Sequence, residues 1–201
     1  MKYIFCLLFL IQTISANALS DEKLYSICNL SNGNNFSFLS LTLSNTYNEV
    51  KDRLISLGFT QNKNGEFLGV HNGYEVRIGV WHKGNKINGL QFRYIENSKS
   101  WNELERVYYQ LKQLLIGIYG NPAICNDGFK CEPFENEKML ESIESGEARY
   151  RACFKSQVEN ADLYILSFTY TQSGVIFEGK KYGEDIVTKS YYVRLDVYLN
   201  D

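Results

Sequence analysis

The stretch that decides the fold is residues 100–122, SWNELERVYYQLKQLLIGIYGNP. Ser100 and Glu103 have the spacing of a capping box, in which the two side chains each bind a backbone N–H that the helix leaves unpaired. Apolar residues then recur at steps of three and four, which places them on one helical face. Gly120 and Pro122 end the pattern, because glycine permits a reversal and proline cannot continue the helical hydrogen bonds. We therefore predict an amphipathic helix with one buried face.

A shorter helix is predicted upstream by the same signals. Thr46 and Glu49 repeat the capping-box spacing. Val50 and Leu54 follow on one face of the expected helix. The pattern predicts a helix over residues 47–57.

The apolar period changes from 3.6 to 2 outside these helices, which is typical of antiparallel strands with one buried face. The residues expected to point inward in the first group are Tyr74, Val76, Ile78, Val80, Leu90, Phe92 and Tyr94. In the last strand they are Tyr191, Val193, Leu195, Val197 and Leu199. Strands are also expected over residues 67–71, 150–155 and 163–171, the last with Tyr164, Leu166, Phe168 and Tyr170 on one face. Asn72–Gly73 and Gly84–Asn85 suit tight hairpin turns.

The expected fold is α+β: an antiparallel β-sheet of about six or more strands, covered on one face by the two amphipathic helices. The expected order is α-β-β-β-α-β-β-β. Residues 126–148 are acidic and loop-like, with a short helix that carries Met139, Leu140 and Ile143. Residues 175–189 suit an additional hairpin. We expect residues 19–201 to form a single domain.

The chain begins with the three parts of a secretory signal peptide. Lys2 precedes an apolar run, and small residues end in Ala16-Asn17-Ala18, so residues 1–18 are expected to be removed. The apolar run is too short for a ~30 Å membrane core, and no later transmembrane segment is expected. The predicted location is therefore secreted or periplasmic. Losing one of the 21 cations leaves 20 against 23 anions, a net charge of −3, so we expect no nucleic-acid partner.

Four cysteines follow the signal peptide: Cys28, Cys125, Cys131 and Cys153. An even number in an exported chain favours two disulfides, for which three pairings are possible. The spacing of Cys125 and Cys131 and the presence of only two histidines do not match a zinc site. We therefore expect neither a metal nor a cofactor.

The middle of the chain has a recognisable pattern of spaced apolar and glycine positions. They are Gly69, Gly73, Tyr74, Ile78, Gly79, Val80, Trp101, Leu104, Tyr108, Leu111, Lys112 and the segment 119–122 before Cys125. This pattern resembles a family of small uncharacterised secreted proteins of gut Bacteroides-type bacteria. The resemblance implies no activity, but it implies that Cys125 pairs with Cys153. Cys28 and Cys131 depart from the family pattern and are left to pair with each other.

The functional hypothesis is a non-enzymatic binding module for a protein or glycan at the cell envelope. Its surface is the sheet face turned away from the helices, because aromatic and arginine side chains are enriched at recognition sites. The residues predicted there are Arg77, Trp81, Gln91, Arg93, Tyr192, Arg194 and Tyr198. An ordinary solvated sheet face would have a similar composition.

An extracellular hydrolase that uses paired carboxylates is the alternative function. Such a pair needs no local sequence motif, so its residues are not identifiable from spacing. His71 and His82 stand beside expected turns without a catalytic motif around them.

Overall fold

The structure, a computed structural model, describes residues 36–71, 74–129, 136–172, 175–177, 180–182, 184 and 186–200. The signal peptide, Cys28 and Cys131 lie outside these residues. The elements are α2 (Tyr47–Ser56), β1 (Thr60–Gln61), β2 (Phe67–His71), β3 (Tyr74–Lys83), β4 (Lys86–Ser98), α3 (Trp101–Tyr119), β5 (Ile124–Phe129), α4 (Asn136–Ser145), β6 (Ala148–Lys155), β7 (Glu159–Gln172), β8 (Val175–Phe177), β9 (Lys180–Tyr182) and β10 (Ile186–Leu199). Within the described ranges, no helix is both long enough and apolar enough to cross a membrane.

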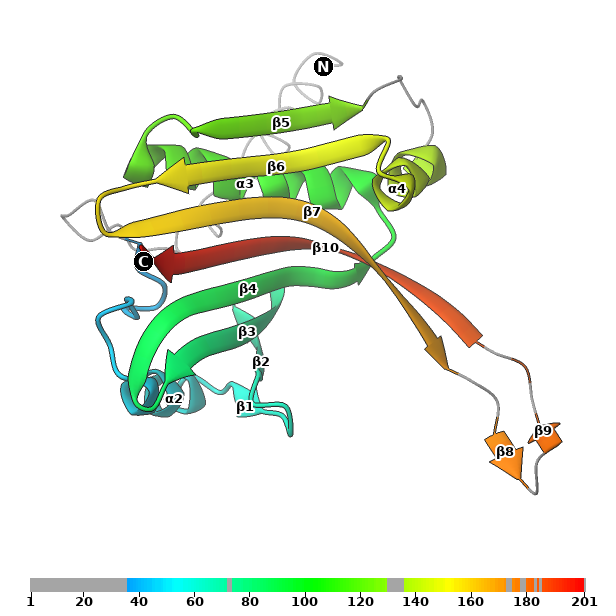
Figure 1. Cartoon of the computed structure of the whole chain (residues 1–201), viewed down its shortest axis with the longest axis horizontal. Coiled ribbons are helices and arrows are strands. Elements are labelled where there is room, and N and C mark those ends of the chain that lie inside the picture. The colour runs from blue at the N-terminus through cyan, green and yellow to red at the C-terminus, as the bar shows by residue number, and fades with distance from the viewer. Residues whose placement is uncertain are drawn as a thin grey trace, which may run out of the picture.

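Eight strands form one antiparallel sheet in the order β1-β2-β3-β4-β10-β7-β6-β5 (Figure 1). The last strand, β10, lies between β4 and β7 and pairs with both. It therefore joins β1–β4 to β5–β7, and the sheet forms only when the end of the chain is in place. The α+β class and the antiparallel sheet are as predicted.

Helix α3 packs on one face of the sheet, against β4, β10, β7 and β6, and α4 lies beside it against β6 and β7. The buried residues of α3 are Trp101, Leu104, Val107, Tyr108, Leu111, Leu114, Leu115 and Ile118. At its start, the Ser100 hydroxyl accepts from the Glu103 N–H at 3.4 Å. The Glu103 carboxylate accepts from the Ser98 hydroxyl at 2.7 Å instead of returning to the cap. The complete capping box is that of α2, between Thr46 and Glu49.

The observed structure differs from the prediction in two places. In residues 126–148 the expected short helix is present as α4, but β5 takes up the start of the region, which was expected to be loop. β5 was not predicted because it is an edge strand with little apolar alternation, and Ile124, Cys125 and Asn126 are all exposed. In addition, α4 stands beside α3, whereas α2 lies next to β1 at the far end of the sheet. The expected pair of covering helices is therefore not the pair observed.

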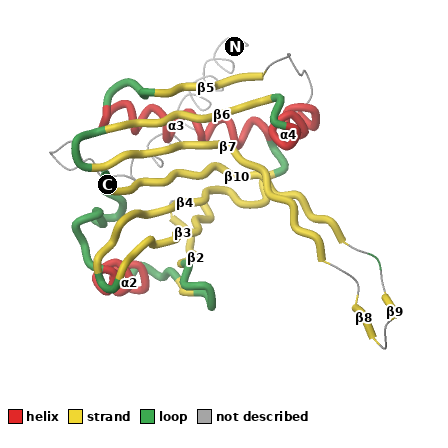
Figure 2. The backbone as a smooth tube through the Cα atoms, viewed as in Figure 1, coloured by secondary structure: helices red, strands yellow, loops and turns green. Residues whose placement is uncertain are grey.

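The sheet has one covered and one open face, and the open face is turned to the viewer in Figure 1, where α3 lies behind the strands. Val76, Phe92 and Val197 are 2%, 0% and 0% exposed, so the predicted strand phases are confirmed. β7 and β10 stay paired from Glu159–Leu199 to Gln172–Ile186. Their outer halves leave the body as a two-stranded arm, beyond which the β8–β9 hairpin lies (Figure 2). The predicted extra hairpin is thus β8–β9, and its last residues belong to β10.

Candidate functional site

Three arginines form a row across the open face. The sheet register pairs Arg77 of β3 with Arg93 of β4, and Arg93 with Arg194 of β10. Tyr192 lies two residues before Arg194 in β10 and shares its face. The structure thus brings together four of the seven predicted surface residues.

Two glutamates neutralise the first two arginines. Glu96 accepts from Arg77 Nε at 2.6 Å and from Arg93 Nη1 at 3.3 Å. Glu66 accepts from Arg77 Nη1 at 3.1 Å and from Arg93 Nη2 at 2.9 Å. Like charges directly opposite each other destabilise a sheet. The two carboxylates remove that repulsion, and we call these four residues the Arg–Glu ring.

Glu96 reaches the open face through a β-bulge. Simple alternation after Phe92 and Tyr94 would point Glu96 inward. The pairing of β4 with β10 shifts register between Tyr94 and Ser98, and Ile95 adopts a left-handed backbone with φ of 49°. Tyr94 and Ile95 are both buried as a result, and Glu96 turns outward. A β-branched residue in this conformation is strained, and strain of this kind clusters at functional sites.

Glu66 is positioned by the turn between β1 and β2. The Asn62 side-chain oxygen accepts from the backbone N–H of Asn64 at 2.9 Å and of Glu66 at 3.0 Å. The Asn62 amide then donates to Glu66 Oε2 at 3.1 Å. Burial opposes ionisation of Glu66, but the bonds from Asn62 and Arg77 and the charges of Arg93 and Arg77 outweigh it and lower the pKa of Glu66. Glu66 is therefore held as a carboxylate.

A hollow of about 520 Å³ opens beside this row, where the arm leaves the body. Its lining consists of Arg77, Arg93, Glu96, Phe168, Tyr170, Thr188, Ser190, Tyr192 and Arg194. Phe168 and Tyr170 are 57% and 56% exposed, which is high for aromatic side chains. The sequence predicted that these two share a face with Tyr164 and Leu166, but it did not assign that face to the surface. We call this concavity the arm hollow.

The other end of the open face carries the remaining predicted aromatics. Trp81 is paired with Gly89, and Gly89 with Tyr198, so both rings flank a residue without a side chain. Their ring centroids are 6.4 Å apart. Tyr198 and Tyr164 each donate a hydroxyl hydrogen bond to Asp162 at 3.1 Å. These residues are outside the lining of the arm hollow.

Gln91 is a correction to the predicted contact surface. It is only 9% exposed. Its amide donates to Asp196 at 3.1 Å, and its carbonyl accepts from Arg93 at 3.1 Å. Arg194 also binds Asp196 at 2.7 Å. Gln91 therefore orients Arg93 and Asp196 and is too buried to contact a partner.

The predicted disulfide between Cys125 and Cys153 is not seen in the structure, where both are free thiols. Cys125 is paired with Ala152 of the covered face, whereas Cys153 is paired with Ile124. Because successive strand residues point to opposite faces, the two sulfur atoms lie on opposite sides of the sheet. Cys125 accepts from Lys112 at 3.0 Å on the covered side. The predicted pairing of Cys28 with Cys131 falls outside the described residues.

Hydrogen bonds within the sheet occupy the carboxylates of the open face. Its carboxylates are held by arginine, glutamine and tyrosine donors from neighbouring strands. Within the described ranges, His, Cys, Asp and Glu form no group of three that could hold a metal ion. Arginine and aromatic side chains are the groups that line the arm hollow on this face.

Comparisons with protein-family models, curated proteins and solved structures found no match. The resemblance to secreted Bacteroides-type proteins stays a prediction.

Proposed function

We propose that the protein is a non-enzymatic binding module, secreted or periplasmic, that holds a partner protein on the open face of its sheet. The arm hollow is the centre of this contact. The observation that carries the proposal is the meeting of Arg77, Arg93 and Arg194 with exposed Phe168 and Tyr170 in one concavity. Arginine and aromatic side chains are the residues that most often dominate binding energy at protein interfaces.

The extent of the surface favours a protein over a small ligand. Along β10, the open face runs from Tyr198 to Thr188, which is about 33 Å at ~3.3 Å per residue. A stable protein interface needs about 800 Å² from each partner, and a surface of this length can supply it. The arm adds contact area that the body alone would lack.

The Arg–Glu ring argues against the hydrolase alternative at this site. A glycosidase needs one carboxylic acid whose pKa is raised, so that it can protonate the leaving group. The pKa of Glu66 is lowered. Both oxygens of Glu96 are also occupied by arginine donors. These carboxylates hold the arginines in place, which is useful to a binding surface.

The test compares two faces of the same arm. The double variant Phe168→Ala, Tyr170→Ala removes the exposed rings of the hollow. Val187→Ala is the control, because Val187 is equally exposed, at 56%, but pairs with Thr171 on the opposite face. Mature protein carrying a photo-crosslinker would be used to capture envelope proteins. The affinity of each variant for the captured partner would then be measured by titration. We expect about tenfold or greater weakening for the double variant and no change for the control.

Two outcomes would overturn this proposal. One is full retention of every captured partner by the double variant and by Arg194→Ala. The other is a captured ligand that survives protease but is destroyed by periodate, which would identify a glycan instead of a protein.

A further inference from the structure

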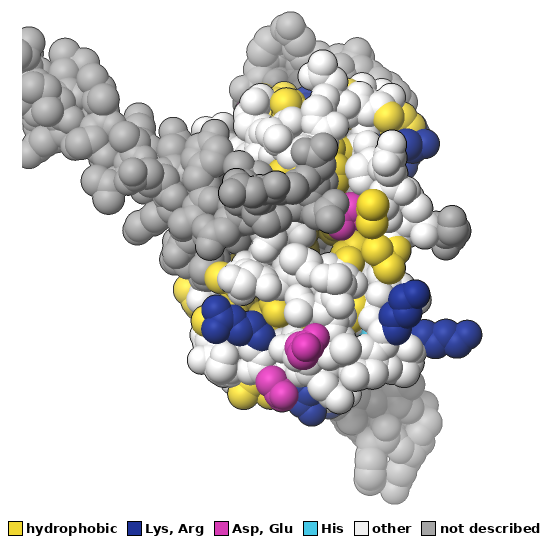
Figure 3. All heavy atoms as spheres, turned by 90° about the vertical axis from the view of Figure 1, so that its left-hand side faces the viewer, with side chains coloured by type: hydrophobic (Ala, Val, Ile, Leu, Met, Phe, Trp, Pro, Cys, Tyr) yellow, Lys and Arg dark blue, Asp and Glu magenta, His cyan; other side chains and the backbone are white. Residues whose placement is uncertain are grey.

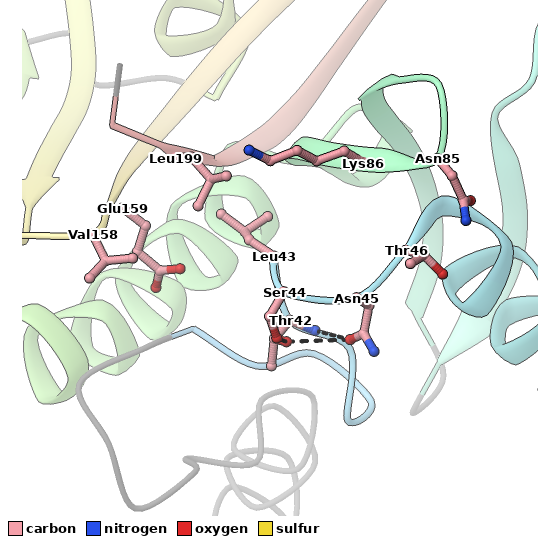
Figure 4. Close-up of a pocket in the computed structure, with 10 residues that line it drawn as sticks. All are labelled: Thr42, Leu43, Ser44, Asn45, Thr46, Asn85, Lys86, Val158, Glu159 and Leu199. Atoms are coloured by element: carbon pink, nitrogen blue, oxygen red, sulfur yellow. Dashed lines mark hydrogen bonds between the residues drawn. The ribbon is translucent and has the colours of Figure 1, made fainter.

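A second hollow of about 520 Å³ lies at the opposite end of β7 and β10 from the arm. Its walls come from residues 42–46, the β3–β4 turn, the β6–β7 turn and the end of β10 (Figure 4). Figure 3 views this end of the molecule, where isolated acidic and basic side chains stand among hydrophobic and uncharged ones. We call it the end pocket, and it shares no lining residue with the arm hollow.

A buried carboxylate faces into the end pocket. Glu159 is 3% exposed. Its Oε1 accepts from the Phe36 backbone N–H and from the Tyr119 hydroxyl, both at 2.6 Å. In Figure 4 the carboxylate points from the β6–β7 turn toward Leu43 across the pocket. Two short bonds to one oxygen fix the group and leave the second oxygen for a ligand.

Among the described residues the Glu159 carboxylate has no counter-ion; it is bound by a backbone amide and a tyrosine hydroxyl. Burying a carboxylate away from any cation is costly. A pocket that surrounds such a group is therefore complementary to a ligand cation, which would form a charge-assisted hydrogen bond there.

The rest of the end pocket is apolar on one side and basic on another. Leu43, Val158 and Leu199 line it with hydrocarbon. Lys86, from the start of β4, also lines it, and in Figure 4 its ammonium lies near Leu199. The pocket thus presents a buried carboxylate and an exposed ammonium group with apolar side chains between them.

We propose that the end pocket binds a small zwitterion whose amine and carboxylate are separated by a short apolar chain, such as an ω-amino acid or a short peptide. The ligand ammonium donates to Glu159, and the ligand carboxylate accepts from Lys86. Its apolar body lies against Leu43 and Leu199. Pockets of this volume with apolar walls and a few polar groups are typical small-molecule sites.

The first test uses three probes that share one apolar body. Binding of 6-aminohexanoate, hexylammonium and hexanoate to the mature protein would be followed by NMR chemical-shift titration. We expect 6-aminohexanoate to bind most tightly, hexylammonium about tenfold more weakly and hexanoate not measurably. Equal binding of hexanoate and hexylammonium would overturn the proposal, as would the absence of binding by all three.

Two variants assign the two charges. Glu159→Gln removes the negative charge but keeps a carbonyl oxygen that accepts from Phe36 and Tyr119, so the fold is expected to persist. It should lose about tenfold or more in affinity for both amine probes. Lys86→Ala should make 6-aminohexanoate and hexylammonium bind alike. Unchanged binding by folded Glu159→Gln would contradict the proposal, and so would unchanged probe discrimination in Lys86→Ala. The Phe168→Ala, Tyr170→Ala variant should bind all probes normally, which separates this site from the arm hollow.

Discussion

The two faces of β10 are stabilised by different forces. On the covered face, Val193, Leu195 and Val197 are all 0% exposed, and burial of apolar surface is sufficient to hold them. On the open face, the Asp196 carboxylate accepts hydrogen bonds from Arg194 and Gln91. Burial is non-directional, whereas these polar contacts depend on geometry. Stability should therefore reside mainly in one face, and recognition in the other.

The largest effect should come from the covered face. Phe92→Ala removes a ring that is 0% exposed and packs on Phe36 and Phe38, with ring centroids 5.6 and 4.7 Å away. We expect a loss of about 3–5 kcal/mol in the free energy of unfolding, measured by urea denaturation. Tyr192→Ala on the open face should cost much less. Equal losses in the free energy of unfolding for the two variants would contradict the expectation that the covered face supplies most of the stability.

Two glycines of the open face allow a substitution and its control to be compared, and we expect an intermediate loss of stability for the first. A Cβ at Gly89 would lie 2.5 Å from the Trp81 ring and 3.0 Å from the Val197 carbonyl oxygen. A Cβ at Gly79 would lie 3.7 Å from Gln91, an ordinary contact. We expect Gly89→Ala to lower the free energy of unfolding by about 1–2 kcal/mol and to displace the Trp81 ring. Gly79→Ala should be neutral or slightly stabilising. Tryptophan fluorescence and denaturation would measure both effects, and an unmoved Trp81 in Gly89→Ala would contradict this packing.

The Arg–Glu ring should contribute less, and in a pH-dependent way. The pKa of Glu66 is lower in the folded protein than the ordinary value of 4.5. Its contribution is therefore complete above that value and is lost as pH falls through the folded pKa. Because the ring is partly exposed, Glu66→Gln should cost about 0.5–1 kcal/mol at pH 7. The difference between wild type and variant should shrink below pH 4.5 in acid-denaturation curves, and a difference that grows there would reverse the assigned sign.

The last prediction concerns the two free thiols, whose accessibility tests the observed pairing of β5 with β6. Cys125 is exposed, whereas Cys153 is buried at 4% exposure, and burial together with Asp162 raises the pKa of its thiol to about 11. Maleimide should label Cys125 rapidly and Cys153 only on unfolding. Mass spectrometry of non-reduced peptides checks the pairing, and a Cys125–Cys153 cross-link would contradict the observed register.

Local signals were sufficient to predict much of the framework. The capping residues and apolar stripes predicted α2 and α3, because these signals act within one or two helical turns. Period-2 alternation placed Arg77, Arg93 and Arg194 on one face correctly, since each strand keeps its own phase. The same rule failed at Glu96, where the bulge at Ile95 reverses the phase. It also missed β5, because an exposed edge strand has little apolar alternation to detect.

The candidate sites depended on long-range placement. Glu66 meets Arg93 only because β2, β3 and β4 are aligned in register, and Phe168 lines the arm hollow only because β10 returns between β4 and β7.

The sequence by itself determined the helices, the strand phases and the α+β class, because propensity, capping and periodicity are properties of neighbouring residues. Only the tertiary structure decided which strand lies at the centre, where Glu96 points, why Cys125 and Cys153 stand apart, and how Glu159 comes to face a pocket. Each of these results depends on contacts between residues distant in the chain, and neighbouring residues contain no record of them.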